Sequence, residues 1–276
     1  MMPTPARPVL KWAGGKSRSL PQILVELPAE IETYYEPFVG GAAVFFALAS
    51  AGRFKRAVLS DRNADLVGVY EAIRDDVGAV IRALKGFKHN SDEYYRVRAM
   101  DPEKLKPAKR AARTIFLNKT GYNGLYRVNS KGQFNVPFGR YKRPNFCDKE
   151  NLEAAARALA SADLRIADFA AVCAKAKPGD AVYFDPPYDP VSKTSNFTAY
   201  HHEDFGTEEH QRLAEMASKL ARRGVSIVLS NSATSFTKSL YRDLSVSEIS
   251  VSRPINSKAS GRGAVQELLV TSRPRP

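Results

Sequence analysis

Short apolar runs that alternate with amphipathic stretches predict an α/β sheet built from both ends of the chain. Apolar runs typical of buried strands end near Pro37 or span residues 56–61, 163–169, 181–184 and 225–229. Apolar residues at helical spacing occupy residues 42–49, 63–73, 152–161, 170–176 and 208–223. Residues 244–252 and 265–272 predict a closing antiparallel pair. Strands that alternate with helices in this way predict a Rossmann-like α/β sheet that is mostly parallel.

The alternation stops between residues 75 and 148, and this predicts an inserted domain. Helical patterns cover residues 77–84, 93–100 and 108–118, and the glycine- and asparagine-rich residues 120–143 then resemble a hairpin. We therefore expect a mainly helical insert with a hairpin at residues 75–148. The α/β domain is expected to comprise residues 1–74 and 149–276.

The positive charge of the chain is concentrated in this insert. The chain has 42 Lys+Arg and 29 Asp+Glu, which gives a formal net charge of +13. Residues 104–147, here called the basic segment, contain eleven lysines and arginines among aromatic residues, with no aspartate or glutamate. Cations neutralise phosphates and aromatic rings stack on bases, so the segment predicts a nucleic-acid partner. The alternative is a basic surface around a small core of its own.

Composition argues against several other classes of protein. No apolar run approaches the roughly 20 residues of a membrane span, and the first residues lack the apolar core of a signal peptide. The two cysteines, Cys147 and Cys173, provide neither a disulfide framework nor a four-cysteine zinc site. His201 and His202 have no third ligand at metal-binding spacing. We expect a soluble protein of a reducing compartment with no membrane contact and no bound metal; as a DNA-binding protein it would be cytoplasmic and nucleoid-associated.

The most informative stretch is Asp-Pro-Pro-Tyr, which directly follows the apolar run 181–184. The prolines cannot continue a strand, so they place a stiff corner at its carboxyl end, where open α/β sheets bind ligands. Asp185 and the carbonyl of Pro186 offer two hydrogen-bond acceptors, and Tyr188 offers a flat ring. These groups suit an amino-substituted heterocycle. The alternative is an ordinary strand that ends in a proline turn.

Other loops supply candidate contacts for a nucleoside with an amino-acid tail. In Lys-Trp-Ala-Gly-Gly-Lys, Trp12 is a candidate aromatic wall and Lys16 a candidate cation for a carboxylate. A phosphate-binding loop would need glycine where Leu10 stands. The glycine turn at Gly40 joins a strand to a helix, and Asp61 follows about 20 residues later, the spacing of a ribose-binding acid. The alternative for Asp61 is a helix cap.

Taken together, these motifs resemble those of the Dam family of DNA adenine methyltransferases, the D12 class. The resemblance extends to Phe-Asn-Val-Pro-Phe-Gly-Arg-Tyr at residues 134–141 and implies a methyltransferase sheet with a DNA-recognition insert. It implies that S-adenosylmethionine contacts Trp12, Lys16, Phe38, Gly40, Asp61, Asp168, Phe169 and Asp185. It implies that DNA contacts Lys11, Tyr122, Asn123, Leu125, Arg127, Pro137 and Tyr141, with Tyr122 or Asn123 supporting the opened duplex. Tyr126 stands where members of the family vary and receives no role.

The implied reaction is methyl transfer to N6 of adenine in double-stranded DNA, within GATC, by a monomer. Hydrogen bonds from N6 to Asp185 and Pro186 would free the nitrogen lone pair, while the base, flipped out of the duplex, stacks on Tyr188. Residues 189–206 are expected to form a lid, with Phe197 and Tyr200 closing over the base or the cofactor. The alternatives are a cytosine-N4 or RNA acceptor, and a non-catalytic DNA-binding protein on the same fold.

Overall fold

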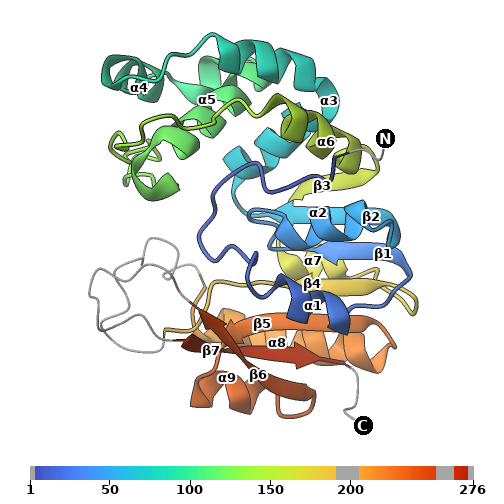
Figure 1. Ribbon diagram of the computed structural model, residues 1–276. Coiled ribbons are helices and arrows are strands. Elements are labelled where there is room, and N and C mark those ends of the chain that lie inside the picture. Colours follow the sequence, from blue (N-terminus) through green and yellow to red (C-terminus); the bar gives the residue numbers. More distant parts are fainter. Residues whose placement is uncertain (1–3, 191–204, 253–263, 273–276) are drawn as a thin grey trace. The chain divides into compact units, whose positions relative to one another are not determined.

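A seven-stranded sheet runs through the computed structural model of the protein, which describes residues 4–190, 205–252 and 264–272 (Figure 1). The strands are β1 (Ile31–Glu36), β2 (Phe54–Asp61), β3 (Ala162–Ile166), β4 (Ala181–Phe184), β5 (Ser226–Ser232), β6 (Ser245–Ser252) and β7 (Ala264–Thr271). Their order is β3-β2-β1-β4-β5-β7-β6. Strands β2, β1, β4 and β5 are parallel, and β7 is antiparallel to both β5 and β6. The predicted mostly parallel sheet with a closing antiparallel pair is confirmed.

The helices agree with the apolar pattern except at short elements. They are α1 (Leu20–Glu26), α2 (Ala43–Ser50), α3 (Ala64–Lys85), α4 (Ser91–Arg98), α5 (Pro107–Thr120), α6 (Lys149–Leu159), α7 (Phe169–Cys173), α8 (Thr207–Arg222) and α9 (Ser235–Leu240), with 3₁₀ turns η1 (Pro102–Lys104) and η2 (Tyr122–Gly124). Helix α3 joins two predicted helices across a non-helical Asp76. The strand expected to reach Phe169 ends at Ile166, because Asp168 caps α7. Helices α1 and α9 were not predicted, since they are too short to establish a helical period.

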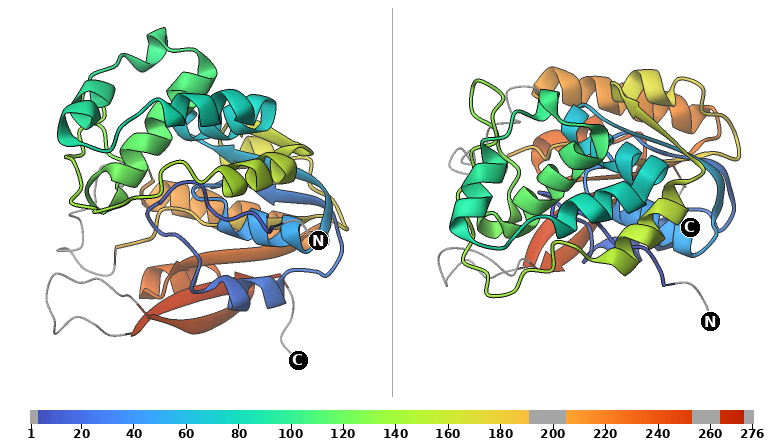
Figure 2. Two further views of the ribbon diagram at one scale, coloured as in Figure 1. Left: turned by 45° about the horizontal axis from the view of Figure 1, so that its top comes forward. Right: turned by 90° about the horizontal axis from the view of Figure 1, so that it is seen from above.

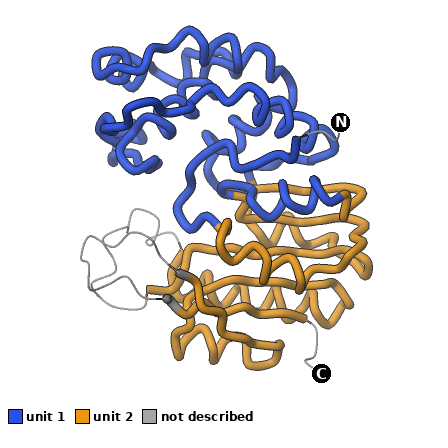
Figure 3. The backbone as a smooth tube through the Cα atoms, viewed as in Figure 1, with its two compact units in different colours: residues 1–15, 40–51, 61–166 blue, residues 16–39, 52–60, 167–276 orange. Residues whose placement is uncertain are grey.

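The chain forms two compact units, shown in different colours in Figure 3. Unit 1 comprises residues 1–15, 40–51 and 61–166, and unit 2 comprises residues 16–39, 52–60 and 167–276. The basic segment lies wholly within unit 1. The domain boundaries expected near residues 74 and 149 stay a prediction.

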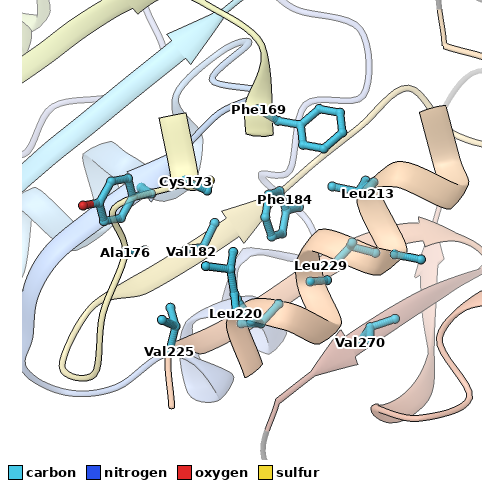
Figure 4. Close-up of a cluster of buried hydrophobic side chains, with 14 of the residues drawn as sticks. Phe169, Cys173, Ala176, Val182, Phe184, Leu213, Leu220, Val225, Leu229 and Val270 are labelled. Atoms are coloured by element: carbon cyan, nitrogen blue, oxygen red, sulfur yellow. The ribbon is translucent and has the colours of Figure 1, made fainter. Parts of the chain in front are cut away.

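The core of unit 2 fixes the point at which β4 ends. All four residues of β4 are fully buried, as expected for a central parallel strand. Val182 and Phe184 belong to a cluster that includes Phe169 of α7 and Leu213 and Leu220 of α8 (Figure 4). Because β4 is held on this apolar face, the residues that follow Phe184 leave the sheet at a defined position.

Unit 1 is built on the packing of α3 against α5, which lie side by side in Figures 1 and 2. Helix α4 packs on α5, and the rings of Tyr94 and Phe116 lie 6.3 Å apart. The Tyr94 hydroxyl donates to the carbonyl of Val136 at 2.9 Å and so ties the hairpin stretch (120–143) to α4. That stretch is an antiparallel hairpin with isolated bridges, Gly121 to Phe138 and Val128 to Phe134.

Candidate functional site

Strands β1 and β4 of unit 2 are neighbours in the sheet, and the strand order runs outward from them in opposite directions. From β1 the chain proceeds to β2 on one side, and β4 lies on the other side of β1 and proceeds to β5. Such a reversal leaves a crevice at the carboxyl ends of the two strands, the usual ligand site of an open α/β sheet. Phe38 follows β1 and Asp185 follows β4, so two residues predicted for the site lie at this reversal.

Lys16 and Asp185 form an ion pair at this edge of the sheet. Lys16 Nζ lies 2.6 Å from Asp185 Oδ1, and the two side chains are 6% and 20% exposed. Lys16 Nζ also lies 4.7 Å from the centre of the Tyr188 ring, a cation–π distance. Burial raises the pKa of Asp185 to about 6, although Lys16 acts in the opposite direction. Lys16, which the sequence suggests as a cation for a ligand carboxylate, therefore also holds the Asp185 carboxylate of the chain itself.

The corner after β4 is tied to the closing strands by hydrogen bonds. The Tyr188 hydroxyl donates to Glu267 Oε2 of β7 at 3.0 Å, and Glu267 is 8% exposed. Burial and the nearby Asp185 and Glu267 carboxylates raise the pKa of the Tyr188 phenol well above its ordinary value. The Asp189 backbone N–H donates to Asn231 of β5 at 3.1 Å. Sequence reasoning missed Glu267; its signal was an acid directly before the apolar run 268–270 in the strand at residues 264–271.

Asp168 and Phe169 lie together at the start of α7. The Asp168 side chain accepts from the backbone N–H of Ala170 at 2.9 Å and pairs with Arg212 of α8 at 3.1 Å. The Phe169 ring is 2% exposed and lies 5.6 Å from the ring of Phe38 and 5.1 Å from the Arg212 guanidinium. The structure thus brings the three predicted cofactor residues Phe38, Asp168 and Phe169 into one cluster. Arg212 was not predicted.

A second group of predicted cofactor residues lies in unit 1 around the glycine turn. Gly40 has a φ of +43°, and a Cβ atom there would lie 2.8 Å from Cδ1 of Trp12, so only glycine fits against the indole. Asp61 accepts from the backbone N–H groups of Gly40 at 3.2 Å and Asn63 at 3.0 Å. Asn63 caps α3, so the alternative reading of Asp61 as the helix cap is not supported.

Lys11 is fixed by a buried asparagine that sequence reasoning missed. The Asn118 side chain accepts from the Lys11 backbone N–H at 2.8 Å and donates to the carbonyls of Lys11 at 2.8 Å and Gly124 at 2.9 Å. Lys11 Nζ lies 4.5 Å from the centre of the Tyr141 ring and 3.3 Å from its hydroxyl. The structure therefore brings together Lys11 and Tyr141, two of the residues predicted to contact DNA.

The remaining predicted DNA contacts are exposed along the hairpin stretch. They are Tyr122, Asn123, Leu125, Arg127 and Pro137. Tyr122 and Leu125 are apolar side chains with 53% and 40% of their surface exposed, and Asn123 has a φ of +54°. The exposed Arg127 guanidinium donates to Asn135 Oδ1 at 2.7 Å, which fixes its position along the hairpin.

Eight of the eleven cations of the basic segment are exposed: Lys104, Lys106, Lys109, Arg127, Lys131, Arg140, Lys142 and Arg143. The other three, Arg110, Arg113 and Lys119, are partly or fully buried. Arg113 is 5% exposed and donates to the carbonyls of Val97 and Arg98, and Arg110 pairs with Asp65 and Glu103. Burial lowers the pKa of Lys119. Most of the predicted basic surface is therefore available to a polyanion, but not all of it.

Some expectations fall outside the described residues, including the lid with Phe197 and Tyr200. Within residues 4–190, 205–252 and 264–272, no helix is long and apolar enough to cross a membrane. The same residues contain no group of three or more His, Cys, Asp or Glu that is arranged to hold a metal ion.

Known proteins resemble this chain over nearly its whole length. A family model described as D12 class N6 adenine-specific DNA methyltransferase matches residues 12–255. The type II methyltransferase M1.LlaDCHI of Lactococcus lactis subsp. cremoris is 40% identical, with 96% of this chain and 95% of the relative covered. The DNA adenine methylase of Escherichia coli strain K12 is 37% identical, with 97% and 96% covered. A solved precorrin-6y C5,15-methyltransferase from Geobacter metallireducens aligns over 96% of this chain and 97% of that chain at 11% identity, with a TM-score of 0.40.

Proposed function

Since the chain belongs to the D12 class of N6 adenine-specific DNA methyltransferases, we propose that it methylates the adenine of GATC in duplex DNA. The class establishes the reaction, methyl transfer to N6 of adenine, and implies S-adenosylmethionine as the donor. The roles of individual residues and the recognised sequence are the proposal. The observation that carries it is the corner after β4, where the half-buried Asp185 lies beside Lys16 and Tyr188.

On the acceptor side, Asp185 and the Pro186 carbonyl accept the two hydrogens of N6. In adenine the N6 lone pair is delocalised into the ring, and two acceptors favour the tetrahedral nitrogen from which the lone pair can attack. Positive charge develops on N6 during transfer, so an ionised Asp185 stabilises the transition state more than the ground state. A pKa of about 6 keeps Asp185 ionised at neutral pH.

Tyr188 supplies the surface on which the flipped adenine stacks. Its hydroxyl is anchored by Glu267, which fixes the plane of the ring. Lys16 Nζ lies over one face of the ring, so we assign the opposite face to the base. Extrusion of a base costs a few kcal/mol, and the phosphate contacts of the exposed cations offset that cost.

On the donor side, the residues present fit a nucleoside with an amino-acid tail. The turn at Gly40 admits only a backbone without Cβ beside Trp12, and the Asp61 carboxylate next to it suits ribose hydroxyls. We assign the adenine moiety to Phe38, Asp168 and Phe169, and the methionine carboxylate to Lys16. When bound, S-adenosylmethionine would supply a methyl group on a sulfonium that leaves as a neutral thioether, and the methylated N6 would then release one proton to solvent, so the step needs no covalent nucleophile and no metal.

For DNA recognition we assign guanine contacts to Arg127 and Lys11, which present cationic donors to O6 and N7. Lys11 is held by Tyr141, and Arg127 by Asn135, so both cations are preorganised. The exposed Tyr122 and Asn123 lie at a tight turn and are assigned to support of the opened duplex. Leu125, Pro137 and Tyr141 are assigned to base contacts beside them.

The specificity is tested by methylating a duplex of random sequence and reading the product base by base. We expect N6-methyladenine within GATC and in no other context. Methylation of adenine elsewhere would overturn the GATC assignment, and N4-methylcytosine or methylation of RNA alone would favour the alternative acceptors. Calorimetry with S-adenosylmethionine separates the enzyme from a non-catalytic DNA-binding protein, which would bind no donor. We further propose that the protein is a monomer that acts on DNA in the cytoplasm. Sedimentation with and without a duplex tests the oligomeric state.

A further inference from the structure

Tyr126 contacts both a residue assigned to the methyl donor and a fixed carboxylate of α3. Its ring lies 5.2 Å from that of Trp12 and 5.8 Å from that of Phe134. Its hydroxyl donates to Asp65 Oδ2 at 2.6 Å. Burial and the bond to Asp65 both raise the pKa of the phenol, so the hydroxyl keeps its proton and acts as a donor. All of these residues belong to unit 1.

The carboxylate that receives this hydrogen bond is itself immobilised. Asp65 Oδ1 accepts from the Arg110 guanidinium at 2.9 and 3.1 Å, so α5 holds Asp65 on its second oxygen. Asp65 lies in the first turn of α3, directly after the loop that begins at Asp61. The Tyr126 hydroxyl is therefore attached to a rigid support rather than to a mobile surface acid, and its ring orientation is defined.

In the chain, Tyr126 stands between Leu125 and Arg127, which we assign to base contacts. Trp12 likewise follows Lys11, which we assign to guanine. Because the Tyr126 ring is held against Trp12, a displacement of the hairpin stretch on DNA is transmitted to the Trp12 indole, and a displacement of Trp12 by a ligand is transmitted to the hairpin stretch. Two rings with centroids 5.2 Å apart are in van der Waals contact, so a shift of one is transmitted to the other.

We propose that Tyr126 is a positioning residue that couples binding of the methyl donor at Trp12 to recognition of DNA by the hairpin stretch. This rests on the proposed roles of Trp12 and Arg127. Thermodynamic linkage requires the coupling to be reciprocal, so the donor tightens DNA binding by the factor by which DNA tightens donor binding. The Tyr126 hydroxyl sets this factor, because without its bond to Asp65 the ring adopts several positions against Trp12.

The coupling is measurable without turnover, because Trp12 is the chain's only tryptophan and its fluorescence reports directly on the site. The probe is S-adenosylhomocysteine, titrated into the full chain with and without a GATC duplex. In the wild type, we expect the duplex to lower the Kd of the probe. Tyr126→Phe keeps the ring and removes the hydroxyl, and we expect the ratio of the two Kd values to fall about tenfold, the loss expected for a hydrogen bond to a charged group.

Two further variants keep the test decisive. Tyr95→Phe removes the hydroxyl of another tyrosine of unit 1, which is 41% exposed on α4, and should leave the ratio at the wild-type value. Asp65→Asn keeps an oxygen acceptor for Tyr126 without its charge, and should give an intermediate ratio. A wild-type ratio in both Tyr126→Phe and Asp65→Asn would overturn the inference while leaving the proposed function intact. Absence of probe binding in the wild type would overturn both.

Discussion

In the proposed mechanism, the ion pair between Lys16 and Asp185 sets the pH range in which Asp185 accepts a hydrogen bond from N6, an effect measured at saturating donor because Lys16 is also assigned to the donor carboxylate. Burial raises the Asp185 pKa to about 6 from an ordinary value of 3.8, while Lys16 at 2.6 Å opposes the rise. Lys16→Met keeps an apolar chain of similar length and removes the ammonium group. The Asp185 pKa should therefore rise above 6 in this variant, because the remaining influences, burial and Glu267, both raise it.

The size of the rise follows from the strength of the lost interaction. A hydrogen bond to a charged group contributes about 1.5–3 kcal/mol. One pH unit corresponds to about 1.4 kcal/mol, so the Asp185 pKa should rise by about one to two pH units. Asp185 would then be largely protonated at neutral pH and would lose an acceptor for N6. The methylation rate of the variant should consequently increase with pH over a range in which the wild-type rate is constant.

The same shift has a defined sign for stability. The folded-state pKa of Asp185 lies above its unfolded value, so this group contributes stability that is complete below about pH 4 and is lost as the pH rises through about 6. The contribution is of the order of 3 kcal/mol. In Lys16→Met the stability contributed by Asp185 continues to be lost up to a higher pH, because the Asp185 pKa is higher. The free energy of unfolding of the variant should therefore fall further below that of the wild type at pH 8 than at pH 5.

The direct assay is an NMR titration of carboxyl carbons in chain labelled at aspartate, with Asp185→Asn to identify the resonance. Lys55→Met is the matched control, because Lys55 also lies 2.6 Å from a carboxylate, that of Glu32, but on a 72% exposed side chain. It should leave the Asp185 titration unchanged. The reasoning is refuted if Asp185 titrates near 4 in the wild type, or if Lys16→Met leaves its pKa where it was.

Three other predictions concern other parts of the site. Glu267→Ala should lower the single-turnover rate about tenfold with little change in DNA affinity, whereas Glu267→Gln, which keeps an acceptor for the tyrosine hydroxyl, should recover most of it. Gly40→Ala should weaken S-adenosylmethionine binding in calorimetry, because its Cβ would meet Trp12 at 2.8 Å and a positive φ costs about 1–2 kcal/mol; unchanged affinity would contradict the assigned wall. Lys142→Ala should reduce the salt dependence of duplex binding by about 0.9 in log–log slope, whereas Arg113→Lys should leave the slope unchanged and lower the melting temperature, because Arg113 is buried.

The parts of the fold that the sequence predicted are those that local patterns encode. Strand β4 is buried on both faces and reads as a continuous apolar run, and the two prolines that follow define its end. The position of Asp185 at the carboxyl end of that strand followed from this pattern alone. Helix α9 has six residues and begins at the capping box of Thr234, so it is too short for a periodic apolar pattern to predict it.

Side-chain partners from distant segments were not predictable. Nothing adjacent to Lys16 indicates that it pairs with Asp185, because that contact exists only after α1 and β4 are placed in the fold. Tyr126 has an unremarkable sequence context, and its bond to Asp65 depends on how the hairpin stretch returns to α3. Asn118 lies among apolar residues of α5, which signals a buried polar group but does not identify its partners.

The central claim is that the corner at Asp185 performs the chemistry rather than supporting the fold or the binding of DNA. Single-turnover methylation and duplex affinity should therefore be measured on the same preparations of wild type and Asp185→Ala. We predict that the variant loses at least about a hundredfold in rate, while its Kd for a GATC duplex remains close to that of the wild type. A rate close to the wild-type value, or a parallel loss of rate and DNA affinity, would contradict the account.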